Sequence, residues 1–570
     1  MSSRRIRRST RTLATDAIVP AGAVRRPWPA PVRRPRSPLR TSAAALGLTL
    51  LAGCGSGPAS PGGRVEGNPP PATRPTLAQT YRPSGHAAAG DVFVHLFEWK
   101  WTDIATECET RLGPEGFAAV QVSPPEEHSI TPNHDWSERY QPVSYSIDRS
   151  RSGTRAEFID MVNRCKAAGV GIYVDAVINH MTNFPSPGTG SNGTNYTKYE
   201  YPGLYTQSDF HAPCTVSNYA DAANVQDCEL FGLPDLNTGS ATVRQKIADY
   251  LIMLARLGVA GFRIDAAKHI QQVELDKIIA LVNSTMASEG KPIPYWFLEV
   301  SAGFGEAIRP ADYFGEGYSS GGSADITEFI FKGVADKFTR LGGTQHLFQL
   351  NPNGSPGNQF SPNAWGMMPS DKAVVFLQNH DTQHDLASQC GLRYTNPQVF
   401  RLANVWMLAQ PYGYPSVLSS YAFSCDQNGI TVGPPSDASG WTLPVSCASS
   451  LETATIGQWV CEHRDPYIAN MVAFRREVAG TDLNHWWDNG ADAIAFSRGD
   501  KGFVAINRES TQVTATPATG MAPGTYCDII TGGRSGSACA GASVVIDAGG
   551  AASLTLPANS AVAILASTKL

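Results

Sequence analysis

Short apolar runs alternate with amphipathic stretches from about residue 91 to residue 482. The runs have the length of buried strands, and the stretches between them have the helical period, as at 155–168 and 243–257. Strands that alternate with helices pair in parallel, and eight such units predict a closed barrel. The sequence therefore predicts an α/β fold, a (β/α)8 TIM barrel. Its eight predicted strands are 92–97, 117–122, 170–178, 261–265, 296–300, 327–329, 373–378 and 414–420.

Two segments break this rhythm. Residues 181–236 are rich in Gly, Asn, Ser, Tyr and Thr, have no helical period and are too long for a simple loop. They predict a small domain inserted after strand 3. Beyond residue 482, short alternating runs separated by Gly and Pro predict a C-terminal antiparallel β-sandwich. The expected domains are thus a barrel formed by 90–180 and 237–482, an inserted domain at 181–236 and a sandwich at 483–570.

The N-terminal region has a different composition. An Arg-rich and Pro-rich stretch leads into an apolar run at 42–54, which is too short to span a bilayer and is typical of a signal peptide. Leu51-Ala-Gly-Cys54 looks like a bacterial lipobox, in which Cys54 would be diacylated. Residues 1–54 are therefore predicted as a signal peptide with a lipobox, and 55–89 as a disordered linker without secondary structure. We expect an extracellular protein, secreted or lipid-anchored to the outer face of the bacterial cell membrane.

Composition and charge limit the classes of partner that the chain is expected to bind. The chain has 570 residues, 42% hydrophobic and 17% charged, and a formal net charge of -5. It has no basic patch, which argues against nucleic acid and against membrane contact other than the lipid anchor. A neutral polar substrate fits better. The sequence does not determine the oligomeric state, and a monomer is the simplest expectation.

The cysteines indicate an exported protein. There are 11, and setting Cys54 aside leaves an even set of ten with no C-x-x-C pair for zinc. An even set predicts disulfides, although spacing alone does not fix their connectivity. The ten are Cys108, Cys165, Cys214, Cys228, Cys390, Cys425, Cys447, Cys461, Cys527 and Cys539.

Three of the apolar runs lead directly into an acid: Asp265, Glu299 and Asp381. Because the carboxyl ends of parallel strands meet at one rim of a barrel, we expect the three acids to lie together there. A glycosidase needs such a set of carboxyl groups. A lone Asp after a strand more often caps the next helix, but three acids at one rim favour chemistry.

Four motifs occur in the order that is characteristic of a known family. The chain resembles the alpha-amylase family of glycoside hydrolases from about residue 91 to residue 570, especially its animal-type, chloride-amylase-like branch as found in actinobacteria. The motifs are Asp175-Ala-Val-Ile-Asn-His180, Gly261-Phe-Arg-Ile-Asp-Ala-Ala-Lys-His269, Phe297-Leu-Glu299 and Gln378-Asn-His-Asp381.

This resemblance implies retaining endo-hydrolysis of alpha-1,4-glucosidic bonds in starch, glycogen and related maltooligosaccharides. Two alternatives remain open: a maltooligosaccharide-forming hydrolase or transglycosylase, and a non-catalytic starch-binding surface lipoprotein. The complete set of acids argues against the second, because a pure binding protein needs no acid/base pair.

The resemblance also assigns roles to the acids. Asp265 is implied as the nucleophile, Glu299 as the acid and later the base, and Asp381 as a residue that grips sugar hydroxyls. Arg263 lies two residues before Asp265, so strand alternation would aim both side chains inward. We expect its guanidinium to keep Asp265 ionised at neutral pH.

The implied substrate-binding residues surround these acids. Tyr140 and Gln141 would form the floor and wall of the cleavage subsite, and Trp136, in a polar loop, is expected as a sugar platform rather than a core residue. Neutral His180 and His380 would bind hydroxyls and lose this role below the usual histidine pKa near 6.5. Lys268 would serve a neighbouring subsite, unless it is an exposed helix lysine. The full set is Tyr140, Gln141, Trp136, His180, Arg263, Lys268, His269 and His380.

The resemblance further implies a structural Ca2+ between barrel and inserted domain. Its ligands would be Asn179, Asp235 and the backbone carbonyls of His269 and Gln226, all oxygen donors of the kind that Ca2+ takes. The animal-type pattern has Arg at the position of Gln226, a change that a carbonyl ligand tolerates.

Three departures from the animal-type pattern are informative. The chloride site matches at Arg263 and Asn379 but has Ser416 as its third member, which predicts activity without chloride. The Gly-rich loop after the third acid is replaced by 384–391. Ser137 replaces the second of two stacking tryptophans, which predicts weaker binding on the non-reducing side.

Four disulfides follow from the same resemblance, and the two remaining cysteines are left to pair with each other across the rim loops. The expected pairs are Cys108 with Cys165, Cys214 with Cys228, Cys447 with Cys461, Cys527 with Cys539, and Cys390 with Cys425.

Overall fold

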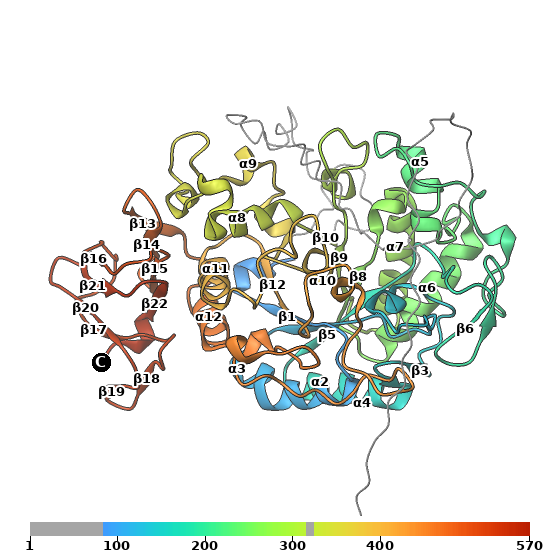
Figure 1. Cartoon of the computed structure of the whole chain (residues 1–570), viewed down its shortest axis with the longest axis horizontal. Helices are drawn as coiled ribbons and strands as arrows, with labels where there is room; N and C mark the ends of the chain where they lie inside the picture. The colour runs from blue at the N-terminus through green and yellow to red at the C-terminus, as the bar shows by residue number, and fades with distance from the viewer. Residues whose placement is uncertain (1–83, 315–323) are drawn as a thin grey trace, which may run out of the picture. The chain divides into compact units, whose positions relative to one another are not determined.

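Eight parallel strands close into a barrel in the order β1-β12-β11-β10-β9-β8-β5-β2 (Figure 1). The structure is a computed structural model that describes residues 84–314 and 324–570. The closed barrel confirms the predicted fold. Its strands are β1 (Phe93–Leu96), β2 (Ala119–Val122), β5 (Gly171–Ala176), β8 (Gly261–Ile264), β9 (Tyr295–Leu298), β10 (Ala324–Thr327), β11 (Ala373–Val375) and β12 (Tyr414–Ser419).

The sixth and seventh strands differ from their predicted ranges. β10 ends at Thr327, where the sequence predicts a strand at 327–329, because the Glu328 side chain accepts the Ile330 N–H at 3.1 Å and starts a 3-10 helix, Phe329–Lys332. β11 ends at Val375 rather than at residue 378. Four residues further on, Asn379 caps a short helix by accepting the Thr382 N–H at 2.8 Å.

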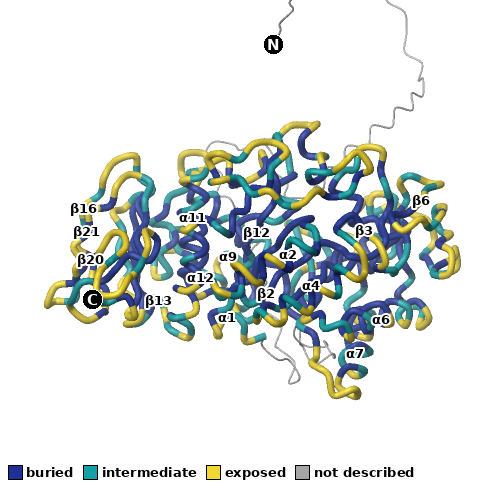
Figure 2. Tube along the Cα trace, turned by 90° about the horizontal axis from the view of Figure 1, so that it is seen from below, coloured by how far each residue is buried: buried dark blue, intermediate teal, exposed yellow. Residues whose placement is uncertain are grey.

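Burial follows the barrel. The strands are dark blue in Figure 2, and the loops around them are largely exposed. One layer of the interior is aromatic, with Phe93, Tyr173, Phe297 and Tyr414 packed together. The helices are α1 (His86–Ala89), α2 (Trp101–Glu107), α3 (Gly113–Glu115), α4 (Arg155–Ala167), α5 (Ala222–Asp227), α6 (Ala241–Arg256), α7 (Gln272–Ser288), α8 (Gly333–Thr339), α9 (Pro362–Trp365), α10 (His380–Gln383), α11 (Pro397–Ala409) and α12 (Pro466–Glu477).

α4 shows how local sequence sets an element. Thr154 and Glu157 form a capping box: the Thr154 N–H donates to Glu157 Oε2 at 2.7 Å, and the Glu157 N–H donates to Thr154 Oγ1 at 3.4 Å. The predicted apolar face of the helix is buried, and Gly169, with φ 79°, follows its C-terminus.

The end of the predicted linker is ordered. Residues 86–89 form α1, in contrast to the prediction of no secondary structure, because tertiary contacts hold them. The His86 ring stacks on Tyr414 with centroids 4.4 Å apart, and its Nδ1 lies 2.9 Å from Asp91 Oδ2. The predicted signal peptide, Cys54 and linker residues 55–83 lie outside the described residues.

The segment 181–236 is irregular, as its composition predicts. It contains the short strands β6 (Gly188–Thr189) and β7 (Asn195–Tyr196) and the helix α5. It returns to the barrel through a bridge between His180 and Asp235 and a hydrogen bond from the Leu236 N–H to the Asn179 carbonyl at 3.0 Å. A further hairpin of the barrel loops consists of β3 (Arg149–Ser150) and β4 (Gly153–Thr154).

The C-terminal residues form two four-stranded antiparallel sheets, β13-β14-β15-β22 and β16-β21-β20-β17, which confirms the predicted sandwich. Burial alternates along β20 and β21, as the period of a half-buried strand requires. The strands are β13 (Leu483–Asp488), β14 (Ala493–Arg498), β15 (Gly502–Asn507), β16 (Val513–Ala515), β17 (Gly524–Cys527), β18 (Arg534–Ser535), β19 (Ala538–Cys539), β20 (Ser543–Ile546), β21 (Ala552–Leu556) and β22 (Ser560–Leu565).

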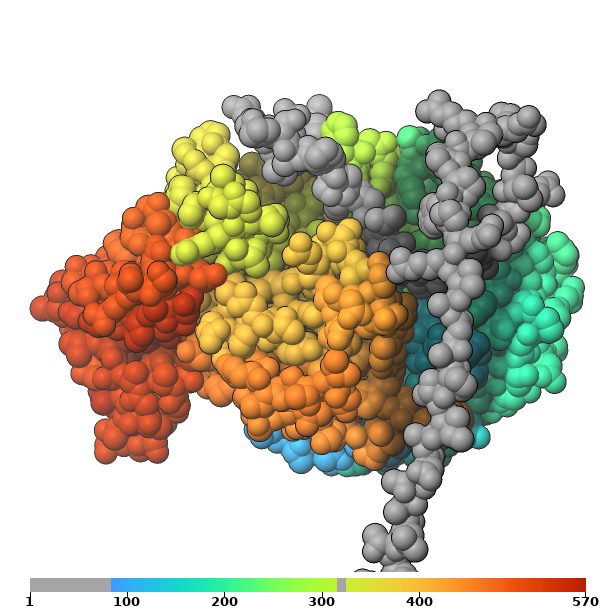
Figure 3. Space-filling view, in the orientation of Figure 1, coloured from blue at the N-terminus to red at the C-terminus, as the bar shows by residue number. Residues whose placement is uncertain are grey.

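Two buried arginines meet at the C-terminus of α11, and one of them, Arg498, joins the sandwich to the barrel. α11 and α12 pack against each other, and the orange and yellow segments of Figure 3 meet there. Arg475 of α12 donates to the Gln410 carbonyl at 2.7 Å, and Arg498 of β14 donates to the Ala409 carbonyl at 2.6 Å. Both guanidinium groups thus satisfy carbonyls at the C-terminus of α11, where positive charge is favourable.

All five expected disulfides are present: Cys108–Cys165, Cys214–Cys228, Cys390–Cys425, Cys447–Cys461 and Cys527–Cys539. Among the described residues, no helix has the length and apolar character needed to cross a membrane.

Candidate active site

Arg263 gathers carboxyl groups at the carboxyl end of the barrel. Asp265 follows β8 directly and Glu299 follows β9 directly. Arg263 Nη1 lies 2.9 Å from Asp265 Oδ1, and Nη2 lies 3.0 Å from Glu299 Oε1. One guanidinium therefore bridges the two acids and holds them as neighbours, as the sequence predicts from their positions at strand ends.

The backbone also positions Glu299. Ala266 has φ 48°, an uncommon conformation for a residue with a Cβ, and its N–H donates to Glu299 Oε2 at 2.8 Å. Strained residues of this kind cluster at functional sites. The turn after Asp265 therefore orients the carboxyl group that follows the next strand.

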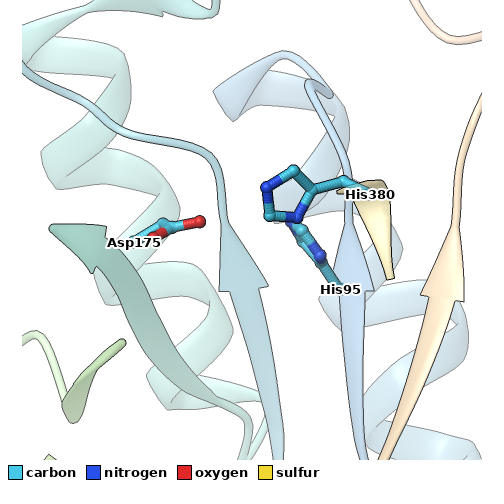
Figure 4. A group of neighbouring side chains, drawn as sticks. All are labelled: His95, Asp175 and His380. Atoms are coloured by element: carbon cyan, nitrogen blue, oxygen red, sulfur yellow. The ribbon is translucent and has the colours of Figure 1, made fainter. Parts of the chain in front are cut away.

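Asp175 is a site residue to which the sequence analysis assigns no role. It is fully buried in β5, and its Oδ1 lies 2.5 Å from Arg263 Nη1 while its Oδ2 accepts the Tyr140 hydroxyl at 3.0 Å. A charged residue in an apolar run, inside a matched motif, is the signal that could have identified it. Figure 4 shows Asp175 pointing from β5 toward the imidazoles of His95 and His380.

His95, Asp175 and His380 offer ligand atoms within 4.8 Å of one another, which is close enough to hold a metal ion. The adjacent guanidinium makes such a site unfavourable, because both Asp175 oxygens are already engaged and the positive charge of Arg263 repels a cation. Burial, followed by the charge of Arg263, lowers the pKa of His95 to about 3. His95, Asp175 and His380 therefore form a polar layer under the acids rather than a metal site.

The Arg263 guanidinium contacts three carboxyl groups, those of Asp175, Asp265 and Glu299. Burial raises the pKa of Asp265 to about 8; Arg263 opposes this rise, and Glu299 and Asp175 add to it. Burial and Glu299 likewise raise the pKa of Asp381 well above its usual range. This differs from the expectation that Arg263 keeps Asp265 ionised at neutral pH, because burial and the neighbouring carboxylates oppose the effect of the guanidinium.

The two site histidines are buried and neutral. The His380 ring stacks on Tyr140 with centroids 4.8 Å apart, and its Nε2 lies 3.4 Å from Asp381 Oδ1. His180 Nε2 lies 3.0 Å from the Tyr140 carbonyl oxygen. Burial lowers the pKa of His180 to about 4 and that of His380 well below 6.5. This corrects the expectation that the two imidazoles become protonated near pH 6.5, because protonation requires a lower pH.

Trp136 is a core residue, which corrects the prediction of a sugar platform. Its side chain is 4% exposed, its ring stacks on His384 with centroids 4.8 Å apart, and its Nε1 donates to the Ile430 carbonyl at 2.9 Å. It therefore supports Tyr140, whose ring it meets edge-on. Gln141 is also buried, and its side-chain oxygen accepts the Thr182 hydroxyl at 3.1 Å.

A cleft opens above the acids. We call it the catalytic pocket; Glu299, Asp381, Lys268, His269 and Phe231 are among the residues that line it. Lys268 is buried, pairs with Glu306 and lies 4.5 Å from the centroid of the Tyr219 ring. The alternative of an exposed helix lysine is therefore wrong. Glu306 was missed by the sequence analysis and becomes recognisable only through this pair.

The predicted calcium ligands lie where the inserted domain meets the barrel. Asp235 Oδ1 is buried without a hydrogen-bond partner among the described residues, and burial raises the pKa of this carboxyl to about 7. Asn179 is buried next to the bridge that joins Asp235 to the barrel. His269 Nδ1 lies 2.8 Å from the Val225 carbonyl oxygen. This contact joins the segment that carries the Gln226 carbonyl to the segment that carries the His269 carbonyl. An unsatisfied buried carboxylate oxygen among oxygen donors fits Ca2+.

The positions matched to a chloride site also come together. Arg263, Asn379 and Ser416 line one small internal cavity beside His95 and Gln378. Of these residues only Arg263 carries a fixed positive charge.

Comparison with known proteins identifies the architecture. Two family models match, "Alpha amylase, catalytic domain" over residues 130–320 and "Alpha amylase, C-terminal all-beta domain" over residues 485–567. An alpha-amylase of Thermomonospora curvata is 43% identical over 489 residues, 85% of this chain and 74% of that protein. Pancreatic alpha-amylase 2a5 of Mus musculus is 41% identical over 502 residues, 84% of this chain and 94% of that protein.

Solved structures agree with the sequence relatives. A crystal structure of a variant of alpha-amylase I from Eisenia fetida, in complex with maltohexaose, superposes with a TM-score of 0.73 at 35% identity. The match covers 86% of this chain and 99% of that one.

Proposed function

The chain belongs to the alpha-amylase family of glycoside hydrolases, and we propose on this basis that it cleaves internal alpha-1,4-glucosidic bonds of starch, glycogen and maltooligosaccharides with retention of configuration. The observation that carries this proposal is the bridge from Arg263 to both Asp265 and Glu299. Retaining hydrolysis needs two carboxyl groups about 5 to 5.5 Å apart, one as nucleophile and one as acid. A shared guanidinium supports that proximity.

Asp265 and Glu299 divide the two steps of a retaining hydrolysis between them. Asp265 attacks the anomeric carbon as a carboxylate while Glu299, in acid form, gives its proton to the departing oxygen; Glu299 then takes a proton from the water that hydrolyses the glycosyl-enzyme bond. Arg263 stabilises the charge that Asp265 carries before attack.

The remaining polar groups orient the sugar. Asp381 and His380, 3.4 Å apart, are proposed to hold hydroxyls of the ring next to the scissile bond, with the Tyr140 ring beside them. His180, Gln141, Lys268 and the other predicted substrate residues complete the cleft, whereas Trp136 supports it from the core.

Calcium is proposed as a structural ion held by Asn179, Asp235 and the backbone carbonyls of Gln226 and His269. Members of the alpha-amylase family commonly bind calcium, and the unsatisfied Asp235 Oδ1 supports the same site here. When bound, the ion would tie the inserted domain to the barrel behind the catalytic pocket.

Activity is proposed to be independent of chloride. The cavity that contains Arg263, Asn379 and Ser416 has a serine where the animal-type pattern has a second guanidinium, which removes much of the attraction for an anion. A halide titration should leave the rate unchanged, and a several-fold rise would refute this assignment.

The chain is proposed to act outside the cell. Five disulfides are typical of an oxidising compartment. Lipidation of Cys54 would retain the enzyme at the membrane surface, and a globomycin-sensitive shift in the mass of the mature protein would test this anchor.

A product time course on amylose tests the enzymatic proposal. Wild type should release a range of maltooligosaccharides from early times, and Glu299→Gln should lose at least about a thousandfold in kcat because it cannot donate the proton. Asp160→Asn, an exposed helix acid, serves as the control. Full activity of Glu299→Gln would refute the assignment, and predominant sugar transfer to oligosaccharide acceptors would favour the transglycosylase alternative.

A further inference from the structure

Phe304 is an exposed aromatic residue in the segment that follows Glu299 in the chain. Its side chain is 78% exposed, the largest fraction among the large apolar side chains of the described residues that stand out as exposed. It lies in the segment that leaves β9 after Glu299. Single exposed apolar residues are ordinary, so exposure alone assigns nothing. The surroundings of this ring distinguish it.

Phe304 lines a cavity of about 300 Å³, at the lower end of the range of roughly 300 to 1,000 Å³ usual for small-molecule sites. We call it the distal pocket. It is defined here by Phe304, Arg309, Pro310, Ile330, Met367 and Met368. Its surface is mainly apolar, with charged groups at a few places, which matches a sugar ring: apolar C–H faces and hydroxyls at the edge.

The distal pocket adjoins the catalytic pocket, because Glu306 and Phe329 line both. This shared wall favours one occupant: further units of a chain that is already bound over Glu299 and Asp381.

Hydrogen bonds brace parts of the wall of the distal pocket. The buried Glu328 carboxylate accepts the Ile330 N–H at 3.1 Å and the Met368 N–H at 2.8 Å, which joins two of the walls. Directly after Glu306, which lines the pocket, the Ala307 N–H donates to the Tyr219 carbonyl at 2.8 Å. A preformed site loses less entropy on binding than a mobile one.

We propose that the distal pocket binds glucose units on the leaving-group side of the scissile bond, with the Phe304 ring stacked on a pyranose face. The side follows from the chemistry, because the segment that builds the pocket begins at the acid that protonates the departing oxygen. The inference rests on the proposed function. It adds a platform to a chain in which Ser137 stands where the resemblance implies a stacking tryptophan.

Substrate length provides the first test. Phe304→Ala should lower kcat/KM for maltoheptaose about three- to tenfold, the size of a typical aromatic contact, and leave kcat/KM for maltotetraose unchanged. Phe304→Trp should restore the maltoheptaose value. Ile456→Ala, which removes a side chain 68% exposed that lines neither pocket, is the matched control. An equal loss on both substrates, or none, would overturn the proposal.

A cleavage pattern provides the second test. With maltoheptaose labelled at its reducing end, the labelled fragment is the leaving group. Phe304→Ala should shift the products toward shorter labelled fragments, because long leaving groups lose their distal contact. A shift toward longer labelled fragments would place the platform on the other side and refute the assignment.

Binding without turnover separates this inference from the proposed function. In a Glu299→Gln background, Phe304→Ala should weaken maltoheptaose binding by the same factor in calorimetry. Failure of wild type to hydrolyse any alpha-1,4-glucan, with the binding effect intact, would remove the proposed function and retain the platform. Normal hydrolysis without any effect of Phe304→Ala on binding would remove the platform alone.

Discussion

Asp175 and Asp265 share one nitrogen atom of Arg263: Nη1 lies 2.5 Å from Asp175 Oδ1 and 2.9 Å from Asp265 Oδ1. The two carboxyl groups therefore compete for the same positive charge. Asp175 touches no substrate in the proposed mechanism, yet its charge raises the pKa of Asp265. It is a positioning residue with an electrostatic effect that can be measured.

Asp175→Asn should move the acidic limb of the kcat/KM profile to lower pH. Removal of this negative charge lowers the pKa of Asp265, so the nucleophile stays ionised to lower pH, while kcat/KM at neutral pH falls about ten- to a hundredfold because Arg263 is held less well. The measurement is kcat/KM on maltoheptaose across pH.

Asp325→Asn is the control for this change. It also removes a buried carboxylate, one that accepts the Tyr295 hydroxyl at 2.8 Å and pairs with Lys372 at 3.0 Å, away from the acid cluster. It should lower stability without moving the limb. An unmoved or raised limb in Asp175→Asn would contradict the competition.

Asp235→Asn should abolish stabilisation by calcium. Wild type should gain about 4 kcal/mol at a free Ca2+ concentration a thousand times its dissociation constant, because the ion binds only the folded chain. Thermal unfolding is followed during a Ca2+ titration after chelation. Asp249→Asn, an exposed change on α6, should respond as wild type does. Equal calcium responses of the Asp235 variant and wild type would exclude Asp235 as a ligand.

Removal of the Cys390–Cys425 bridge should loosen the loop after Asp381. Gln389 and Cys390 have φ 53° and 60°, and both precede Gly391, which has φ 61°, so three successive left-handed residues depend on outside restraint. The double alanine variant should show faster amide exchange across 384–391 and a lower kcat.

The double alanine variant at Cys527 and Cys539 is the control for that loop. It removes a bridge from the sandwich, where it should lower stability by about 2 to 4 kcal/mol and leave kcat as in wild type. Unchanged exchange across 384–391 in the Cys390 and Cys425 variant would show that the rim is held without the bridge.

Glu107→Gln should destabilise the barrel in a pH-dependent way. Burial alone would raise the pKa of Glu107, but hydrogen bonds from His463 at 2.8 Å and Arg464 at 2.7 Å outweigh it and lower the pKa to about 2. The folded pKa lies below the unfolded value of 4.5, so the contribution is complete above about pH 4.5 and is lost as pH falls toward 2.

Urea unfolding at several pH values measures this contribution. The variant should lose about 3 kcal/mol at pH 7 and progressively less below pH 4.5. Glu109→Gln, which breaks the exposed pair with Arg164, should change little at any pH. A loss that stays constant with pH would show that the charge of Glu107 contributes nothing.

Local pattern was sufficient for the barrel and for the position of its acids. Strand alternation places Arg263 and Asp265 on one side of β8, and the parallel topology brings Glu299 beside them. Pattern fails at residues whose partners are distant in sequence. Trp136 lies in a polar stretch, but its hydrogen-bond partner Ile430 is 294 residues away.

Two further predictions from the sequence were wrong for the same reason, because the partners that decide them are distant in sequence. His86 belongs to a segment of linker composition that becomes helical because Tyr414 provides a surface for it. The pKa of Asp265 depends on how many carboxyl groups surround one guanidinium, a number that the neighbours of Asp265 in sequence do not reveal.

The contacts of Arg475 and Arg498 bear on how this chain can be cut. Each donates a hydrogen bond to a carbonyl at the end of α11, and one of the two guanidinium groups comes from the sandwich. The boundary near residue 482 thus separates two patterns in the sequence but not two autonomous modules. An enzyme truncated there would expose the apolar flank of α11 and leave carbonyls at the end of α11 without the Arg498 donor. Exchange of this sandwich between relatives therefore requires that Arg498 and the C-terminal end of α11 are transferred together.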